Sequence, residues 1–207
     1  MSNTISITLG GTIIAMIMFG TPAAASPNVD LSNPAFAPAT GPTSIPVGAA
    51  EFCKSHRDEC APNVRIVDVE TLTQQSWDQL VAVNDDVNRR IVPETDQDLY
   101  NVAEFWSYPD GRGDCEDFAL EKRRQLLQAG WDASTLLMTV VRERNGNGHA
   151  VLMVRTDRGD LVLDNQDGRV RVWQDTPYEY IKRQSQTDAG KWVGLADSRA
   201  TIVAAAN

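Results

Sequence analysis

The chain lacks an excess of positive charge, a surplus of cysteine and an apolar run long enough to cross a membrane. Its 207 residues carry a net charge of −9, which argues against nucleic acid or an anionic membrane surface as a partner and permits cation binding. The hydrophobic share of 42% and charged share of 23% are ordinary, so neither a disordered chain nor a polytopic membrane protein is indicated. The length suits one domain.

The first 25 residues contain no acid and no Lys or Arg. An apolar stretch from Ile5 to Phe19 is shorter than the roughly 20 residues of a spanning helix, and Ala23 and Ala25 form a small-residue cleavage site. We therefore predict a signal peptide at 1–25, although its usual positive charge is missing, and a periplasmic or secreted protein. A retained membrane anchor is the alternative.

Residues 26–50 contain five prolines and a single charge, Asp30. This composition predicts a flexible Pro-rich linker. The domain is then expected at 51–195, followed by a loose tail at 196–207.

Cysteine is scarce, and its three positions are informative. Cys53 and Cys60 are close in the chain and, in an oxidising compartment, are expected to form a disulfide. Cys115 is then the lone thiol, inside the sequence Gly-Asp-Cys-Glu-Asp at 113–117. A lone thiol in an exported protein calls for an explanation.

Hydrophobic periodicity predicts helices first and strands afterwards. Helical spacing covers 71–92, ending at Pro93, and a second helix runs from Cys115 to a stop at Gly130, with 121–124 facing outward. Turn sequences separate four expected strands, at 136–142, 149–156, 161–165 and 170–173. This order indicates an α+β domain in which N-terminal helices pack on an antiparallel sheet.

The chemistry of the lone thiol points to nucleophilic catalysis. A helix N-terminus stabilises a thiolate, which favours Cys115 as the nucleophile. His149 is the one histidine downstream and Asp164 follows it, so the three occur in a plausible triad order of nucleophile, base and orienting acid. Taken singly, His149 is more simply a residue at the edge of the core, and Asp164 a strand-end acid in an Asx turn.

The expected strand register gives Asp164 the weakest support among the three candidate triad residues. A two-residue turn at Arg158-Gly159 would place Asp164 opposite Met153, on the same sheet face as His149 but four residues away. Direct opposition to His149 requires a turn centred at Thr156-Asp157, or a bulge.

The acids beside Cys115 allow two interpretations. Asp114 and Glu116 suit a helix cap and a first-turn acid, which local chemistry favours. They also suit calcium, whose site needs six to eight oxygens. Without a bound cation, Asp114 and Glu116 would raise the pKa of the Cys115 thiol. Asp117 is a candidate for a third calcium ligand.

The ordered motifs resemble the bacterial transglutaminase-like cysteine proteinases over about 51–195. The resemblance rests on Phe52-Cys53 with Cys60, Val87-Asn88, Asp96, Trp106, Pro109, the segment 113–117, Lys122-Arg123, 148–152, Arg155-Thr156-Asp157, Gly159-Asp160, Leu163-Asp164-Asn165 and Arg183-Gln184-Ser185.

The resemblance implies a papain-like transglutaminase core with Cys115 as nucleophile, His149 as base, Asp164 as orienting acid, and Asp114 and Glu116 in calcium binding. It further implies calcium-dependent endoproteolysis of a surface adhesin and a membrane-bound inhibitor protein. Two alternatives stay open: acyl transfer, as in a transglutaminase or deamidase, and a non-catalytic calcium-responsive periplasmic binding domain. The Cys115 N–H is one expected oxyanion donor, and Trp106 is expected in the core or lining the cleft.

Overall fold

A computed structural model describes residues 29–197. The predicted signal peptide and nearly all of the predicted tail lie outside these residues. Within them, no helix is both long and apolar enough to span a bilayer. The elements, in chain order, are β1 (Ala39–Thr43), α1 (Val47–Ser55), a 3-10 turn (Arg57–Cys60), α2 (Gln74–Arg90), β2 (Val92–Pro93), α3 (Asp96–Tyr100), β3 (Arg112–Gly113), α4 (Cys115–Gln128), β4 (Leu136–Arg142), β5 (Gly148–Thr156), β6 (Gly159–Leu163), β7 (Arg171–Val172), β8 (Glu179–Gln184) and β9 (Trp192–Leu195).

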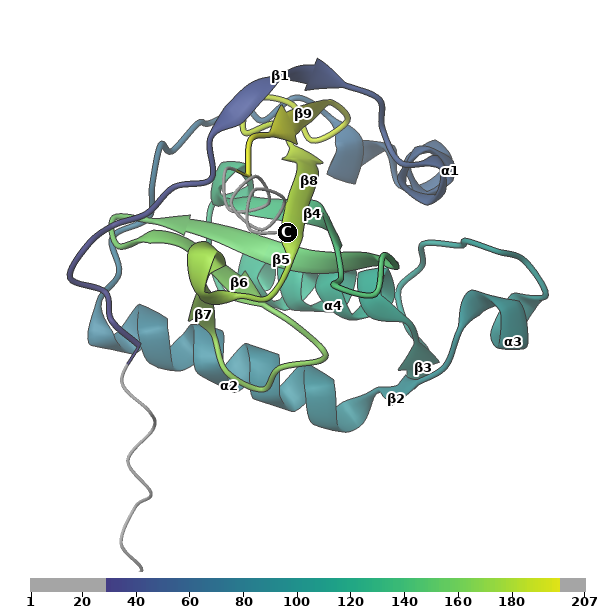
Figure 1. Ribbon diagram of the computed structural model, residues 1–207. Coiled ribbons are helices and arrows are strands. Elements are labelled where there is room, and N and C mark those ends of the chain that lie inside the picture. The colour runs from purple at the N-terminus through teal and green to yellow at the C-terminus, as the bar shows by residue number, and fades with distance from the viewer. Residues whose placement is uncertain (1–28, 198–207) are drawn as a thin grey trace, which may run out of the picture.

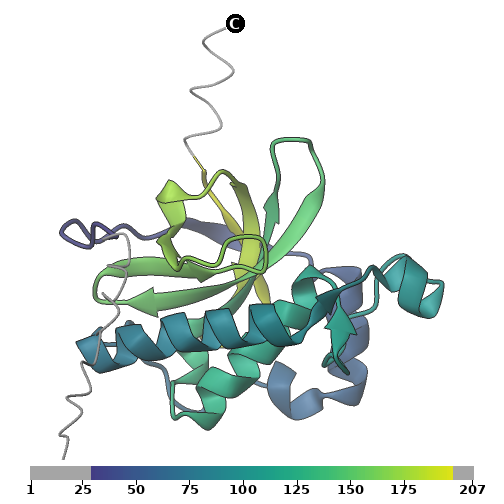
Figure 2. The same ribbon diagram turned by 90° about the horizontal axis from the view of Figure 1, so that it is seen from below.

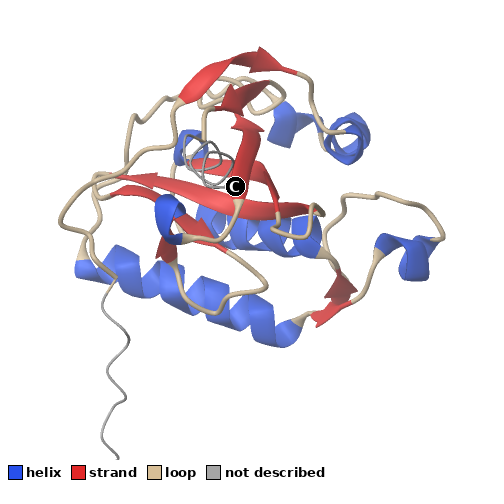
Figure 3. Ribbon diagram, viewed as in Figure 1, coloured by secondary structure: helices blue, strands red, loops and turns tan. Residues whose placement is uncertain are grey.

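Seven strands form one antiparallel sheet in the order β1-β9-β8-β4-β5-β6-β7. Helices α2 and α4 lie side by side against one face of it (Figures 1 and 2). The predicted α+β fold, with helices packed on an antiparallel sheet, is therefore confirmed, as the separation of blue helices from red strands shows (Figure 3). The core fills the space between the two layers with buried side chains of α4, β4, β5 and β6.

Local sequence explains where the two main helices begin and end. Thr73 and Ser76 form a reciprocal capping box at the start of α2, which satisfies backbone donors that the first helical turn leaves free. Helix α4 ends before Gly130, whose φ of 95° suits a residue without a Cβ. Both helices match the sequence prediction closely.

The prediction that residues 121–124 of α4 face outward is wrong for three of the four, since only Arg124 is partly exposed. Glu121, Lys122 and Arg123 are all buried, with at most 5% of each exposed. Arg123 donates to the Leu136 carbonyl and pairs with Glu59 at 3.2 Å. Helix α4 is covered by α2, the sheet and the N-terminal segment, so even its charged residues are enclosed and hydrophobic periodicity could not define an outer face.

The predicted linker is also wrong for its C-terminal half. Strand β1 pairs with β9 at the sheet edge, and Ala37 N–H donates to the buried Asp160 at 2.8 Å. Proline and glycine are tolerated in such an edge strand because one side of it makes no ladder hydrogen bonds. Composition read locally could not reveal pairing with a strand about 150 residues away.

The predicted disulfide between Cys53 and Cys60 is confirmed, with Cα atoms 5.6 Å apart. It joins α1 to the 3-10 turn that carries Glu59. Glu59 accepts hydrogen bonds from Tyr108 and Arg123. The disulfide therefore holds the carboxylate that neutralises a buried arginine of α4.

Candidate active site

Cys115 is the first residue of α4. The turn before it is tight: a Cβ on Gly113 would lie 2.5 Å from the Asp117 carboxylate, so a larger residue would displace the buried Asp117 side chain. Short pairing of β2 with β3 fixes the approach of the chain to this turn. The sequence thus places a thiol at a helix N-terminus, where free N–H groups and the helix dipole favour an anion.

The Cys115 thiol contacts two groups. Its Sγ donates to Glu116 Oε2 at 3.2 Å and accepts from the Ala150 N–H at 3.3 Å. Burial raises the pKa of the thiol well above its ordinary value, and the charge of Glu116 raises it further. Without a positive charge nearby, the sulfur is therefore a protonated thiol. This is the effect on the thiol pKa that we expected from the acids next to Cys115 in the sequence.

His149 and Asp164 are joined by a hydrogen bond of 2.9 Å between Nε2 and Oδ1, and both side chains are buried. Asp164 also accepts from Tyr178 Oη at 2.5 Å and from the Gln166 N–H at 3.0 Å. Burial by itself would raise the pKa of Asp164. Its hydrogen bonds lower that pKa below its ordinary value, and the bond with His149 contributes most. This geometry suits a tautomer in which His149 Nε2–H donates to Asp164, which leaves Nδ1 as the acceptor nitrogen that faces away from the carboxylate.

The strand register accounts for this contact. Thr156 pairs with Gly159 and Leu152 with Leu163, so the turn residues are Asp157 and Arg158. This register is two residues closer to direct opposition than a turn at Arg158-Gly159 would give. Strand β6 ends at Leu163, so Asp164 lies just beyond the ladder and reaches the His149 ring.

Cys115 and His149 line one cleft of about 380 Å³, between the ends of β2 and α4 and the start of β5. Gln166 lies beside the ring, with Nε2 3.5 Å from His149 Nδ1. Within residues 29–197, no hydrogen bond joins the thiol to His149. The structure nevertheless brings the three predicted triad residues to a single site.

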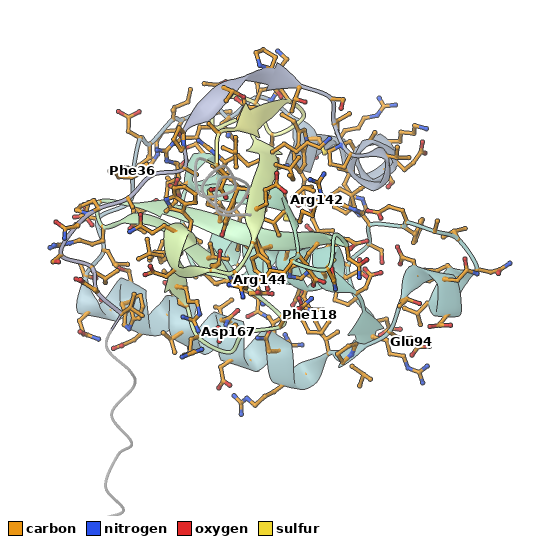
Figure 4. All side chains as sticks on the ribbon, viewed as in Figure 1. Phe36, Glu94, Phe118, Arg142, Arg144 and Asp167 are labelled. Carbon is orange, nitrogen blue, oxygen red and sulfur yellow. A yellow bond between two sulfur atoms is a disulfide. The ribbon has the colours of Figure 1, made fainter. Side chains whose placement is uncertain are left out.

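A second pocket, of about 410 Å³, adjoins this cleft and shares Glu143 and Gln166 with it. Arg144 and Asp167, labelled in Figure 4, contribute to its lining. Trp106, by contrast, is 5% exposed and packs against Trp192 in the core. Of the two roles considered for Trp106, the structure supports the core role.

Four buried or partly buried carboxylates gather at the N-terminus of α4. Each has a buried oxygen without a hydrogen-bond partner: Asp96 Oδ1, Asp114 Oδ1, Glu116 Oε1 and Asp117 Oδ2. Ligand atoms of Asp96, Asp114 and Asp117 lie within 4.8 Å of one another, as do those of Asp114, Cys115 and Glu116. Asp114 occupies the N-cap position, but its side chain makes no cap hydrogen bond. The cap interpretation of Asp114 is therefore not supported.

The electrostatics of this cluster are unfavourable for the protein alone. Burial raises the pKa of Glu116 to about 10, with Asp114 adding to the shift, and raises that of Asp117 to about 7. Burial likewise raises the pKa of Asp96. A set of hard, unpaired oxygens fits a hard cation such as Ca²⁺, whose charge would reverse these shifts.

Three residues at this site were given no role from the sequence. Asp96 lies 18 residues before Asp114 and meets it only through the β2–β3 pairing, with its N–H donating to Asp114 Oδ2 at 3.2 Å. Tyr178 comes from the segment before β8, and Gln166 from the loop after β6. None of the three has a local spacing that predicts its role.

Comparison with known proteins gives a family and related structures. The model of the family described as bacterial transglutaminase-like cysteine proteinases matches residues 39–200. Calcium-bound LapG of Legionella pneumophila is similar, at 26% identity and a TM-score of 0.46, over 51% of this chain and 62% of the LapG chain. The EGTA-treated form gives 26% identity and a TM-score of 0.47, over 59% and 72%. The match thus spans less than two thirds of the calcium-bound LapG chain. No curated protein sequence matches the chain.

Proposed function

The chain belongs to the bacterial transglutaminase-like cysteine proteinases, and we propose that it is an exported, calcium-dependent cysteine endopeptidase with a Cys115–His149–Asp164 triad. One observation carries the proposal. The His149–Asp164 pair, bonded at 2.9 Å, opens onto the same cleft as the only free thiol among the described residues, and that thiol begins a helix.

Each step of amide hydrolysis can be assigned to residues of this site. His149 Nδ1 takes the Cys115 proton, and the thiolate forms a bond to the scissile carbonyl carbon. The tetrahedral oxyanion accepts the Cys115 N–H at the start of α4. The carbon–nitrogen bond then breaks while His149 returns the proton to the leaving amine. Water, deprotonated by His149, hydrolyses the thioester and restores the thiol.

Asp114 and Glu116 are the proposed calcium ligands, with Asp96 and Asp117 added by the geometry. The unpartnered oxygens and raised pKa values of this cluster support the assignment. Calcium held by these carboxylates would supply positive charge beside the thiol, which would lower the thiol pKa and favour the thiolate. Glu116 accepts a hydrogen bond from Sγ. With calcium bound, the Glu116 carboxylate would interact with the ion in place of the sulfur.

The proposed substrate is a protein, such as a cell-surface adhesin, cleaved outside the cytoplasm, and a membrane-bound inhibitor protein is the proposed regulator. These expectations rest on the family resemblance and on the predicted signal peptide. Acyl transfer to an amine is the alternative reaction, because the same thioester forms in both. The satisfied His149–Asp164 pair favours an enzyme over a calcium-responsive binding domain.

The test is an incubation of the full chain with unfolded and adhesin-like proteins, with calcium or with EGTA. Cleavage that needs calcium and is lost in Cys115→Ala supports the proposal. Amine incorporation without cleavage would establish acyl transfer instead. Absence of cleavage, combined with no labelling of Cys115 by a thiol-reactive peptide probe in calcium, would contradict an enzyme.

A further inference from the structure

The side chain of Gln166 lies at the boundary between the cleft and the second pocket. It lines both of them, as does Glu143. Gln166 comes from the loop after β6, two residues beyond Asp164, and its backbone N–H donates to Asp164 Oδ1 at 3.0 Å. The His149 ring contacts the same oxygen. The loop that supplies the orienting acid therefore also brings Gln166 to the base.

Glu143 fixes the orientation of the Gln166 amide. It lies in the hairpin between β4 and β5, next to Arg142 and Arg144, which Figure 4 labels. Gln166 Nε2 is 2.6 Å from Glu143 Oε1. The hydrogen bond from Gln166, and a further one from Asn145, lower the pKa of Glu143. An ionised carboxylate only accepts hydrogen bonds, so the amide atom that faces it is the nitrogen.

The same amide nitrogen also faces the base. Gln166 Nε2 lies 3.5 Å from His149 Nδ1, on the side of the ring away from Asp164. An amide nitrogen has two hydrogens, so one can be donated to Glu143 while the other is directed at Nδ1. Nδ1 is the acceptor nitrogen in the tautomer that suits the bond to Asp164. The Gln166 amide therefore contacts the atom that is proposed to receive the thiol proton.

Gln166 also separates two groups of opposite tendency. The two Glu143 oxygens accept from the amides of Gln166 and Asn145, which carry no charge. One amide nitrogen thus lies between an ionised carboxylate and a ring that can take up a proton. The other titratable groups that face the ring or line its cleft are Asp164, Tyr178, Asp114, Cys115 and Glu94.

We propose that Gln166 is a positioning residue for the base, which directs an amide N–H at His149 Nδ1 and keeps the Glu143 carboxylate from pairing with the ring. This inference rests on the proposed function, since it concerns the same base. A carboxylate paired with the ring would favour a proton on Nδ1, and a ring protonated there cannot accept the thiol proton. A neutral amide has no such charge, and its contact with Nδ1 can give way to the thiol.

The test is a histidine titration by NMR on the full chain carrying Cys115→Ala, in which no thiol titrates beside the ring. The chain has only two histidines, so His56, stacked on Phe52, serves as the internal reference. Gln166→Met should move the midpoint of the His149 titration upward by about 0.5 pH unit or more, because the ring then meets the charge of Glu143 directly. The His56 midpoint should not move.

The matched control is Gln74→Met at the exposed start of α2. The Gln74 amide donates to the Asp78 carboxylate at 2.8 Å, so this variant removes the same kind of hydrogen bond away from the site. It should move neither histidine midpoint.

A double variant separates the proposed role from a general change of structure. Adding Glu143→Gln to Gln166→Met should return the His149 midpoint close to that of the parent protein, because the charge that Gln166 kept from the ring is gone. Gln166 is exposed, so we expect Gln166→Met to fold. An unmoved His149 midpoint in Gln166→Met, or a raised midpoint that persists when Glu143→Gln is added, would overturn the inference.

This readout needs no substrate, so it is independent of the proposed function. A Glu143-dependent shift, in a chain that cleaves no protein when Cys115 is present, would support Gln166 and contradict the peptidase. Cleavage by the chain with Cys115 present, together with no shift in Gln166→Met, would do the reverse.

Discussion

The two halves of the candidate site differ in how completely the protein satisfies its own polar groups. On the sheet side, Asp164 accepts three hydrogen bonds and has a lowered pKa. On the helix side, acids around Cys115 have unpartnered oxygens, and the pKa of Glu116 is raised to about 10. The polar groups of the proposed base and its orienting acid are therefore satisfied within the described fold, whereas those around the proposed nucleophile are not.

This contrast suggests how one ion can control the enzyme. Under the proposed function, the Cys115 side of the site is the one that needs a cation, because of the two sides it is the one where burial leaves carboxylate oxygens without partners. The sheet side should therefore keep its geometry when calcium is removed. The following predictions test that division.

The largest effect is expected from the reacting groups. Cys115→Ala or His149→Ala should lower kcat/KM for a cleaved protein by about 1,000-fold or more, because triad members act as a unit. The double variant should lose little beyond either single one. Calcium binding, measured by titration calorimetry, should persist in His149→Ala. Additive losses would contradict a cooperating pair.

The next effect is expected from the cation ligands. Asp114→Asn and Glu116→Gln should weaken calcium binding and lower activity by about 100-fold at limiting calcium, because each removes a charged oxygen ligand. Their effect on activity should equal that of EGTA on the wild type. Asp110→Asn, an exposed acid outside the cluster, is the matched control. Full activity of Glu116→Gln in EGTA would contradict the assignment.

A smaller effect is expected on the sheet side. Tyr178→Phe removes the hydrogen bond to Asp164 Oδ2 and leaves those from His149 and Gln166, so kcat/KM should fall by about 10-fold, the value of one hydrogen bond to a charged group. Calcium affinity should not change. Tyr100→Phe, on the exposed α3, is the control. Equal loss of calcium affinity would show that the two halves are not separate.

The last prediction concerns the stability of the metal-free protein. Burial chiefly raises the pKa of Glu116 to about 10 and of Asp117 to about 7, so the folded state binds more protons than the unfolded state between about pH 5 and 7. Stability in EGTA should therefore fall with rising pH, by about 1.4 kcal/mol per unit for each such proton. Burial lowers the pKa of Lys122 to about 7, so this lysine remains protonated over most of this range.

Calcium should remove that decline, because the ion replaces the protons. The measurement is the melting temperature at several pH values with EGTA and with calcium. In Glu116→Gln the EGTA curve should flatten. A melting temperature in EGTA that rises from pH 5 to 7 would contradict the raised pKa values.

Local signals predicted much of this protein. The helical period, Pro93 and Gly130 fixed the two main helices, and the turn sequences fixed the meander, because these features depend on neighbours in the chain. The lone thiol and the single downstream histidine pointed to Cys115 and His149 as candidate site residues, which the fold brings to one cleft. The disulfide followed from two cysteines seven residues apart.

Tertiary structure decided the rest. The Asp157-Arg158 turn and the end of β6 brought Asp164 to His149. Folding enclosed the charged face of α4, paired β1 with a distant strand, and added Asp96 and Tyr178 to the site. Sequence determined which residues have reactive chemistry and where regular elements form, because both depend on nearby residues. Burial and long-range pairing depend on the whole packed chain, so only the fold could show which acids lack partners.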